Sequence, residues 1–368
     1  MKAIVVKFGS STVTDRRGRL RRTLLAARAA EIAELVRAGR HVVIVSSGAI
    51  ACGQTLLGMT ERPRRMPALQ AASAVGQGRL FSAWARLLGR HGLTAAQILL
   101  TSADVAERVN YVNARRTLRR LLNWGIVPII NENDTTATDE IRFGDNDVLA
   151  AQVAIMLRAE ALLLLTDRGG LYTADPRVDP SARLIASLDD SAVLDSVDLT
   201  DAGRGGAGGM RGKVAAALMA ASANVRTVIA GGAEDGAILR VAAGEEVGTV
   251  LRPCAGRDSA FKLWLRYAKP VRGTLEIDEG ARRALSEGGG SLLPVGVVAV
   301  HGTFSAGDAV ALRACDGREV ARGIASLDAR QVRAVAGLRS QEARRVVPEA
   351  SEEVVHRDRL VLIDEECR

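Results

Sequence analysis

Residues 126–149 read Ile-Val-Pro-Ile-Ile-Asn-Glu-Asn-Asp-Thr-Thr-Ala-Thr-Asp-Glu-Ile-Arg-Phe-Gly-Asp-Asn-Asp-Val-Leu. The stretch begins as an apolar run, changes to amides and carboxylates at residues 131–134, and enters a helix-like segment near Asp145. A short, continuous apolar run is typical of a buried strand. Polar side chains where such a strand ends predict the functional edge of a parallel sheet, because open α/β sheets bind ligands at the carboxyl ends of their strands.

Five other short aliphatic runs resemble this strand, and helix-length segments separate them. One of those segments, residues 20–38, carries apolar side chains on one face and stops before Gly39. This alternation predicts an α/β fold with a mostly parallel sheet sandwiched by helices, because parallel strands need crossover connections. The five runs are residues 3–6, 41–45, 95–100, 161–165 and 226–230.

The pattern changes after residue 252. Gly- and Pro-containing breakers flank a short hydrophobic segment, and short strand-like pieces separated by Gly and Asp turns follow. We therefore expect a small β-rich domain after the α/β domain. The predicted division is residues 1–255 for the first domain, 256–272 for a linker, 273–350 for the second domain and 351–368 for a C-terminal segment.

The composition fits a globular enzyme with an aliphatic core, since 48% of the 368 residues are hydrophobic and only 3% are aromatic. The formal net charge of +8 is modest for this length, so the basic clusters indicate solvated surface more than an RNA site. The cysteines lack the spacing of a metal site or a disulfide framework. No apolar run is long enough to span a membrane, and we expect a cytoplasmic protein.

Two strand-like runs lead into turns of small residues. In Val5-Val-Lys-Phe-Gly-Ser-Ser-Thr12 the turn follows Lys7, and in Val45-Ser-Ser-Gly-Ala-Ile-Ala-Cys-Gly53 it contains Ser47. Backbone N–H groups at such turns, with an ammonium or hydroxyl group beside them, favour anion binding. Neither turn has the spacing of a P-loop. Each alone is also consistent with a surface lysine or an ordinary helix cap.

The polar loop after residue 130 places Asp134, Asn146 and Asp147 near that same sheet edge. Such groups would bind the α-ammonium of an amino acid or organise a magnesium ion held by phosphates. Capping of the following helix would explain one of these aspartates, but not polar groups on both sides of the loop.

Two later stretches point to a nucleotide. Thr166 and Asp167 end a very apolar strand, and residues 206–213 form a glycine-rich segment in which Lys213 precedes an expected helix at 214–223. Phosphoryl transfer depends on positioning and on charge neutralisation, which a lysine on a mobile loop opposite Lys7 would provide. A flexible surface loop is the alternative interpretation.

Taken in order, these motifs resemble the amino acid kinase family. Within that family, Ile-Asn-Glu-Asn-Asp at 130–134 followed by Phe-Gly-Asp-Asn-Asp at 143–147 is similar to the glutamate 5-kinase group, and residues 288–296, 302–308 and 355–358 resemble a PUA domain. The resemblance implies transfer of phosphate from ATP, with Mg²⁺, to the γ-carboxylate of L-glutamate. The product would be L-glutamyl 5-phosphate, in the first step of proline biosynthesis.

The resemblance also implies roles for individual residues. ATP would be bound by Lys7, Gly9, Thr166, Asp167, Ala207, Gly208, Gly209, Met210, Arg211, Gly212 and Lys213. Glutamate would be held by Ser47, Asp134 and Asn146. The catalytic residues would be Lys7, Lys213 and Asp147, the last orienting both lysines. No protein ligand to a metal is assigned.

Partners follow from the same resemblance: a homo-oligomer, dimer or tetramer, with proline as a feedback inhibitor. Two alternatives stay open at this point, a kinase for aspartate or N-acetylglutamate and an RNA-binding PUA protein. RNA binding is the less favoured, because the C-terminal region lacks aromatic stacking platforms and a dense cationic strip.

Overall fold

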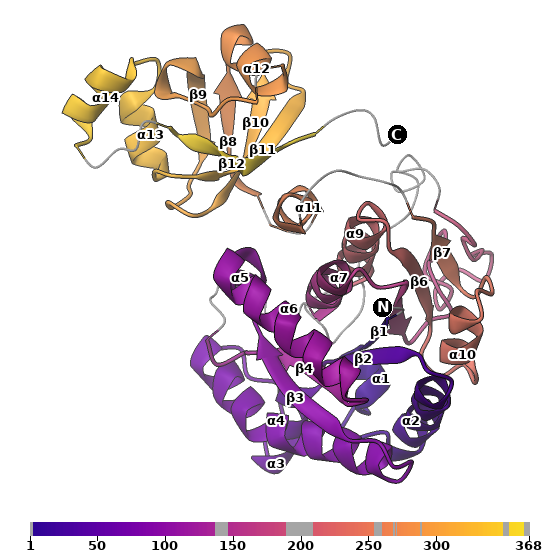
Figure 1. Ribbon diagram of the computed structural model, residues 1–368. Helices are drawn as coiled ribbons and strands as arrows, with labels where there is room; N and C mark the ends of the chain where they lie inside the picture. Colours follow the sequence, from indigo (N-terminus) through magenta and orange to yellow (C-terminus); the bar gives the residue numbers. More distant parts are fainter. Residues whose placement is uncertain are drawn as a thin grey trace. The chain divides into compact units, whose positions relative to one another are not determined.

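The computed structural model describes residues 3–136, 146–188, 209–253, 260–267, 269, 271–287, 289–348 and 353–363. The chain divides into two compact units, Met1–Ala260 and Phe261–Arg368, whose elements are labelled in Figure 1. The helix α11 (Ala260–Tyr267) occupies part of the segment that we predicted as a linker.

Within the described residues, the first unit is built on a seven-stranded sheet of order β3-β4-β2-β1-β5-β6-β7. All neighbours pair in parallel except β7, which runs antiparallel to β6. The predicted mostly parallel α/β sheet is therefore confirmed. The strands are β1 (Ala3–Phe8), β2 (His41–Ser46), β3 (Ala95–Leu100), β4 (Val127–Glu132), β5 (Ala161–Thr166), β6 (Arg226–Gly231) and β7 (Thr249–Leu251).

Helices cover both faces of this sheet (Figure 1). Ile4, Val6 and Phe8 of β1 join the core under the first group of helices. Because successive side chains of a strand point to opposite faces, Lys7 faces the second group. The first group is α2 (Arg22–Arg37), α4 (Met66–Gly89) and α10 (Ala237–Ala242), and the second is α6 (Arg108–Asn123), α7 (Asn146–Leu157) and α9 (Met210–Ala221). The short helices α1 (Ser10–Val13), α3 (Ala49–Leu56) and α5 (Ser102–Ala106) follow β1, β2 and β3.

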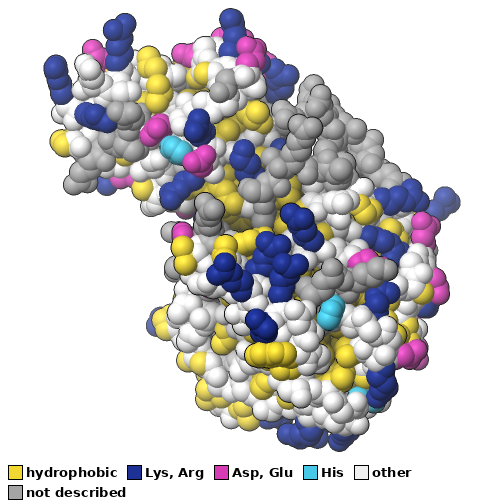
Figure 2. All heavy atoms as spheres, viewed as in Figure 1, with side chains coloured by type: hydrophobic (Ala, Val, Ile, Leu, Met, Phe, Trp, Pro, Cys, Tyr) yellow, Lys and Arg dark blue, Asp and Glu magenta, His cyan; other side chains and the backbone are white. Residues whose placement is uncertain are grey.

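Helices α7 and α6 of the second group differ in solvent exposure. Almost every residue of α7 is buried, as expected for a helix that is apolar all round and packs against the sheet, α6 and α9. Helix α6 is amphipathic: Leu118 and Leu122 are buried, whereas Arg116, Arg119 and Arg120 are exposed. Figure 2 shows Lys and Arg side chains gathered over this part of the first unit. These arginines thus lie on the solvent side of an amphipathic helix.

Helix α4, to which our sequence analysis assigned no element, packs tightly on α3. A Cβ atom added at Gly53 of α3 would lie 1.7 Å from the carbonyl oxygen of Ala72, and one at Gly76 of α4 would lie 1.9 Å from that of Ala49. Only glycine allows this backbone-to-backbone approach. The contact holds α4 against α3, the helix that follows β2.

The second unit contains a five-stranded sheet of order β12-β11-β10-β8-β9 with a hydrophobic core of its own. The predicted β-rich second domain is confirmed. Strand β12 falls in the segment 351–368, which we had set apart from that domain, yet it pairs with β11. The strands are β8 (Val271–Ile277), β9 (Val297–Gly302), β10 (Ala309–Ala314), β11 (Glu319–Ala325) and β12 (Val355–Leu362). The helices are α12 (Glu279–Ser286), α13 (Ala329–Val335), α14 (Ser340–Val346) and the 3₁₀ turn η1 (Pro294–Gly296).

We find no helix in the described parts of either unit that is long and apolar enough to cross a membrane.

Candidate active site

The predicted site residues gather at the carboxyl ends of the parallel strands. Phe8 at the end of β1 pairs with Ser46 on one side and with Leu165 on the other, so β1, β2 and β5 end level with one another. Lys7, Ser47 and Thr166 are therefore brought to one edge of the sheet. The polar strand ends predicted a functional site at this edge.

A buried group of three charges lies at this edge. The Nζ atom of Lys7 is 2.6 Å from Oδ1 of Asp147, and the Nζ atom of Lys213 is 3.3 Å from Oδ2 of the same carboxylate. These side chains come from β1, α7 and α9. Lys7 and Asp147 are only 3% and 2% exposed. The structure thus brings together the three residues that we predicted to be catalytic.

The charge state of Asp147 follows from its neighbours. Burial would raise the pKa of its carboxyl group, but the ammonium groups of Lys7 and Lys213, and the hydrogen bonds they donate, hold that pKa below its usual range. The group therefore combines two ammonium ions with one carboxylate away from bulk water. Such a place favours an incoming anion, and a phosphoryl group meets this requirement.

One expectation about Lys213 was wrong. We predicted a mobile loop with the lysine ahead of a helix at residue 214, but α9 begins at Met210, and the backbone N–H of Lys213 donates to the carbonyl of Gly209 at 3.2 Å. The helix runs through Gly212 because its following residues are buried against α7 and β6, and such packing overrides the low helix propensity of glycine. Lys213 is thus fixed in a first helical turn.

The other predicted residues of this segment divide into two sets. Gly209, Met210 and Gly212 are half-buried at the start of α9, whereas Arg211 is exposed. Ala207 and Gly208 lie outside the described residues, so their predicted contact with ATP stays a prediction.

Neutral hydrogen bonds surround Asn146, next to the charged group. Its Nδ2 atom donates to Oγ of Ser47 and to Oδ1 of Asn131, both at 3.0 Å. Its Oδ1 atom accepts the backbone N–H of Glu132 at 3.2 Å. Two predicted substrate residues, Ser47 and Asn146, are therefore in direct contact, and Asn131 joins them.

Asp134, the third predicted substrate residue, is buried with one oxygen occupied. The hydroxyl of Ser73 on α4 donates to Oδ2 at 2.5 Å, while Oδ1 is buried and has no hydrogen-bond partner among the described residues. Burial raises the pKa of this carboxyl group, although the Ser73 hydrogen bond and the positive charge of Arg62 act in the opposite direction. A buried acceptor without a donor is costly, so Oδ1 is suited to a ligand that brings one.

Thr166 and Asp167 lie at the end of β5. The Thr166 hydroxyl donates to Oδ1 of Asp167 at 3.1 Å, and Thr166 is buried whereas Asp167 is exposed. Gly9 is close to the charged group, because a Cβ atom added there would lie 3.7 Å from Nζ of Lys7. That is an ordinary contact distance, so sterics do not require glycine at this position.

Sequence reasoning missed two residues of this edge, Ser73 and Gln77, both on α4. The carbonyl oxygen of the Gln77 side chain accepts from Nδ2 of Asn131 at 2.5 Å. Nothing in the local sequence around α4 marks these side chains, because they meet their partners only through the tertiary fold.

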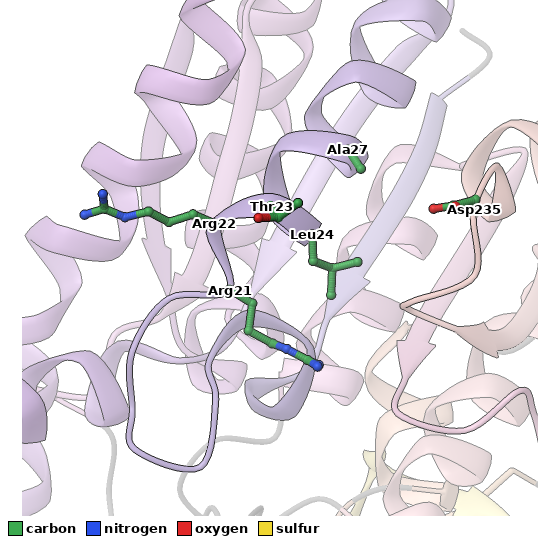
Figure 3. Close-up of a pocket in the computed structure, with 6 residues that line it drawn as sticks. All are labelled: Arg21, Arg22, Thr23, Leu24, Ala27 and Asp235. Carbon is green, nitrogen blue, oxygen red and sulfur yellow. The ribbon is translucent and has the colours of Figure 1, made fainter.

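A surface pocket lies elsewhere, at the start of α2 (Figure 3). None of the predicted site residues is among those that line it. The lining residues are Arg21, Arg22, Thr23, Leu24, Ala27 and Asp235.

Comparisons with known proteins give the family. The model of the amino acid kinase family matches residues 2–231, and that of the PUA domain matches residues 273–347. Two similar relatives, both named glutamate 5-kinase, come from Cupriavidus pinatubonensis and Paraburkholderia phymatum. They are 47% identical over 368 residues and 46% identical over 366 residues, each alignment covering 98% of this chain and 98% of the relative.

Among solved structures, a UMP kinase from Bacillus anthracis matches with a TM-score of 0.48 and 19% identity, covering 69% of this chain and 97% of its own. The two family matches and the relatives cover both units of the chain. The chain therefore belongs to the amino acid kinase family, in its glutamate 5-kinase group, and carries a PUA domain.

Proposed function

We propose that this protein transfers the γ-phosphoryl group of ATP to the γ-carboxylate of L-glutamate. The product is L-glutamyl 5-phosphate, and the reaction is the first step of proline biosynthesis. One observation carries the proposal: the buried Lys7–Asp147–Lys213 group lies at the same sheet edge as the polar subsite of Ser47 and Asn146. The relatives named glutamate 5-kinase support the same conclusion.

The charged group serves the phosphoryl side. A γ-carboxylate oxygen attacks the γ-phosphorus, the bond from that phosphorus to the bridging oxygen breaks, and ADP leaves. No proton has to move, because the nucleophile is already an anion. Lys7 and Lys213 stabilise the charge on the transferring phosphoryl group, and Asp147 holds both ammonium groups in place.

We assign the nucleotide to the ends of β1 and β5 and the start of α9. Lys7, Gly9, Thr166, Asp167 and the segment from Ala207 to Lys213 contact ATP. Mg²⁺ accompanies the nucleotide, since this ion keeps several waters and is usually bound through one or two carboxylates and the phosphates. The exposed carboxylate of Asp167 is chemically suited to that ion or its waters.

The polar subsite serves the amino acid. The oxygen of Ser47 accepts a hydrogen bond from Asn146, which leaves the Ser47 hydroxyl proton to donate to a substrate carboxylate. The buried Oδ1 atom of Asp134 accepts from the α-ammonium of glutamate. Asn146 keeps this subsite in register with Asp147, its neighbour in the chain.

Further expectations belong to this proposal. Proline shares the α-carboxylate and α-nitrogen of glutamate, so it competes for the subsite of Asp134 as a feedback inhibitor. The protein acts in the cytoplasm as a dimer or tetramer of identical chains, and RNA binding stays the less favoured activity. The domain limits drawn from the sequence, with a linker at 256–272, stay a prediction.

An ADP-release assay with three acceptor acids tests the proposal. L-Glutamate with Mg-ATP is expected to support turnover, and aspartate and N-acetylglutamate are expected to do so poorly. Aspartate is one methylene shorter than glutamate, and N-acetylglutamate lacks the ammonium group that would donate a hydrogen bond to Asp134. A kcat/KM for either acid comparable with that for glutamate would refute the assignment.

A further inference from the structure

We propose that Ser73 and Gln77 of α4 are positioning residues for the acceptor amino acid, each fixing the orientation of a polar side chain that contacts it. The inference rests on the proposed function, because it assigns the amino acid to the subsite of Asp134, Asn146 and Ser47. Neither residue reaches the charged group of Lys7. Their effect should therefore fall on glutamate and not on ATP.

Gln77 stands at the start of a chain of buried hydrogen bonds. Its carbonyl oxygen accepts from Nδ2 of Asn131, which directs Oδ1 of Asn131 toward Nδ2 of Asn146. The second hydrogen on that nitrogen then donates to Ser47. An amide has one accepting and one donating end, so fixing the first amide fixes the direction of every later bond. Gln77 thereby leaves the Ser47 hydroxyl as a donor.

Ser73 acts on Asp134 in a parallel way. Its hydroxyl occupies Oδ2 at 2.5 Å and leaves Oδ1 as the open acceptor. A carboxylate that is only 6% exposed and bonded at one oxygen is restricted in rotation about its terminal bond. Ser73 thus prepares Asp134 for an ammonium group before the ligand arrives, which lowers the entropic cost of binding.

The placement of α4 explains how one helix serves both side chains. Ser73 and Gln77 are four residues apart, so they share one face of the helix, and Gly76 lies on that same face. Gly76 is one of the points at which α4 meets the backbone of α3. On β4, alternation puts Asn131 on the face of Val127 and Ile129, which belong to the core that α4 covers. The close contact at Gly76 therefore fixes the position of α4 at which Ser73 and Gln77 reach the edge of the sheet.

The experiment compares substitutions in α4 with matched exposed controls. Ser73→Ala and Gln77→Met remove the two hydrogen bonds with little change in volume, and Gln77→Glu restores an oxygen acceptor. Ser82→Ala on the same helix and Gln97→Met on β3 make the same chemical changes at exposed positions. Steady-state kinetics gives kcat and KM for glutamate and for ATP, and thermal unfolding is recorded with and without glutamate.

We expect Ser73→Ala and Gln77→Met to raise the KM for glutamate about tenfold, the scale of one lost hydrogen bond in a buried site. Their kcat and their KM for ATP should stay within about threefold of the parent values, because the charged group is untouched. Gln77→Glu should recover most of the glutamate KM. The thermal shift produced by glutamate should shrink in the first two variants and persist in both controls.

Several results would overturn the inference. One is a glutamate KM within twofold of the parent in both Ser73→Ala and Gln77→Met. Another is an equal rise in the KM for ATP, which would indicate a general loss of structure. A third is Gln77→Glu behaving like Gln77→Met. Should Gln77→Met fail to fold, Gln77→Asn, which keeps the amide but shortens its reach, gives the same test. A parent enzyme that does not use glutamate would refute the proposed function instead.

Discussion

Replacing Asp147 by asparagine should destabilise the first unit strongly, because the two ammonium groups beside it would lose their shared counter-ion. The carboxylate lies 2.6 Å from Nζ of Lys7 and 3.3 Å from Nζ of Lys213, and it is 2% exposed. Removing one partner of a buried ion pair typically costs about 3–5 kcal/mol, since the remaining charge stays buried without compensation. We expect Asp147→Asn to fall in this range at neutral pH.

Glu160→Gln provides a matched control in the same unit. Glu160 also pairs at short range, with Nη2 of Arg40 at 2.7 Å, but its side chain is 44% exposed. Exposed ion pairs contribute about 0–1 kcal/mol, because water solvates both partners. Both variants remove one negative charge from a short ion pair, but Asp147 is buried between two ammonium groups whereas Glu160 faces water beside one guanidinium, so the difference reports the cost of breaking the buried group.

Urea denaturation followed by tryptophan fluorescence measures both losses. Trp84 is fully buried in the core of the first unit, so replacing Trp124 and Trp264 by phenylalanine leaves a signal from that core alone. The depressed pKa of Asp147 gives a second check. Its stabilisation is present above the unfolded-state pKa of about 3.9 and is lost as pH falls through the folded value. The difference between parent and Asp147→Asn should therefore narrow below about pH 4. A loss in Asp147→Asn no greater than in Glu160→Gln at neutral pH would refute this reasoning.

Three other perturbations have clear expected outcomes. Lys213→Ala should lower kcat about a hundredfold or more, the scale of a lost preorganised charge, with a smaller change in the KM for glutamate; normal kcat would exclude α9 from the site. Burial raises the pKa of Asp134, so kcat/KM for glutamate should begin to fall with decreasing pH above the usual aspartate range. Ser73→Ala should move this acid limb to still higher pH, because the hydrogen bond from Ser73 favours the ionised carboxylate. An acid limb unchanged in Asp134→Asn would count against Asp134 as its origin. Gly76→Ala should cost about 1–3 kcal/mol or more in urea denaturation, since its methyl group would meet the Ala49 carbonyl, whereas Gly78→Ala, with open space around its Cβ, should be neutral or stabilising.

The strand ends of the fold could be predicted from the sequence because their signals are local. The apolar runs before Lys7, Ser47 and Thr166 mark buried strands, and the change to polar residues marks the edge at which they end. Parallel pairing then brings those ends together with no further information. The order of the strands does not follow in the same way, since β1 lies between β2 and β5 through contacts distant in sequence.

Helix α4 and its role could not be predicted from local sequence, because the residues that explain them lie in three separate chain segments. The helix contains Gly76 and Gly78, which lower helix propensity, and no Asp, Glu or side-chain cap marks its start. The need for glycine at residue 76 follows from its contact with Ala49, and the role of Gln77 follows from its hydrogen bond with Asn131. The prediction of where α9 begins was wrong for a related reason. Its glycines favour a loop locally, whereas burial of the following residues stabilises a helix.

The two halves of the candidate site solve different electrostatic problems. A phosphoryl group carries several charges, so its half needs ammonium groups, and burying these without ligand requires a carboxylate between them, which is Asp147. The amino-acid half of the site must discriminate its substrate from similar acids, so it needs hydrogen-bond donors and acceptors held in fixed directions. Asn146 and Asp147, adjacent at the start of α7, belong one to each half. A shift of α7 would therefore disturb both ligands together, whereas a change in α4 should disturb the amino acid alone. Comparing Ser73→Ala with Lys213→Ala separates the two halves of the site, because Ser73 serves the amino acid and Lys213 serves the phosphoryl group.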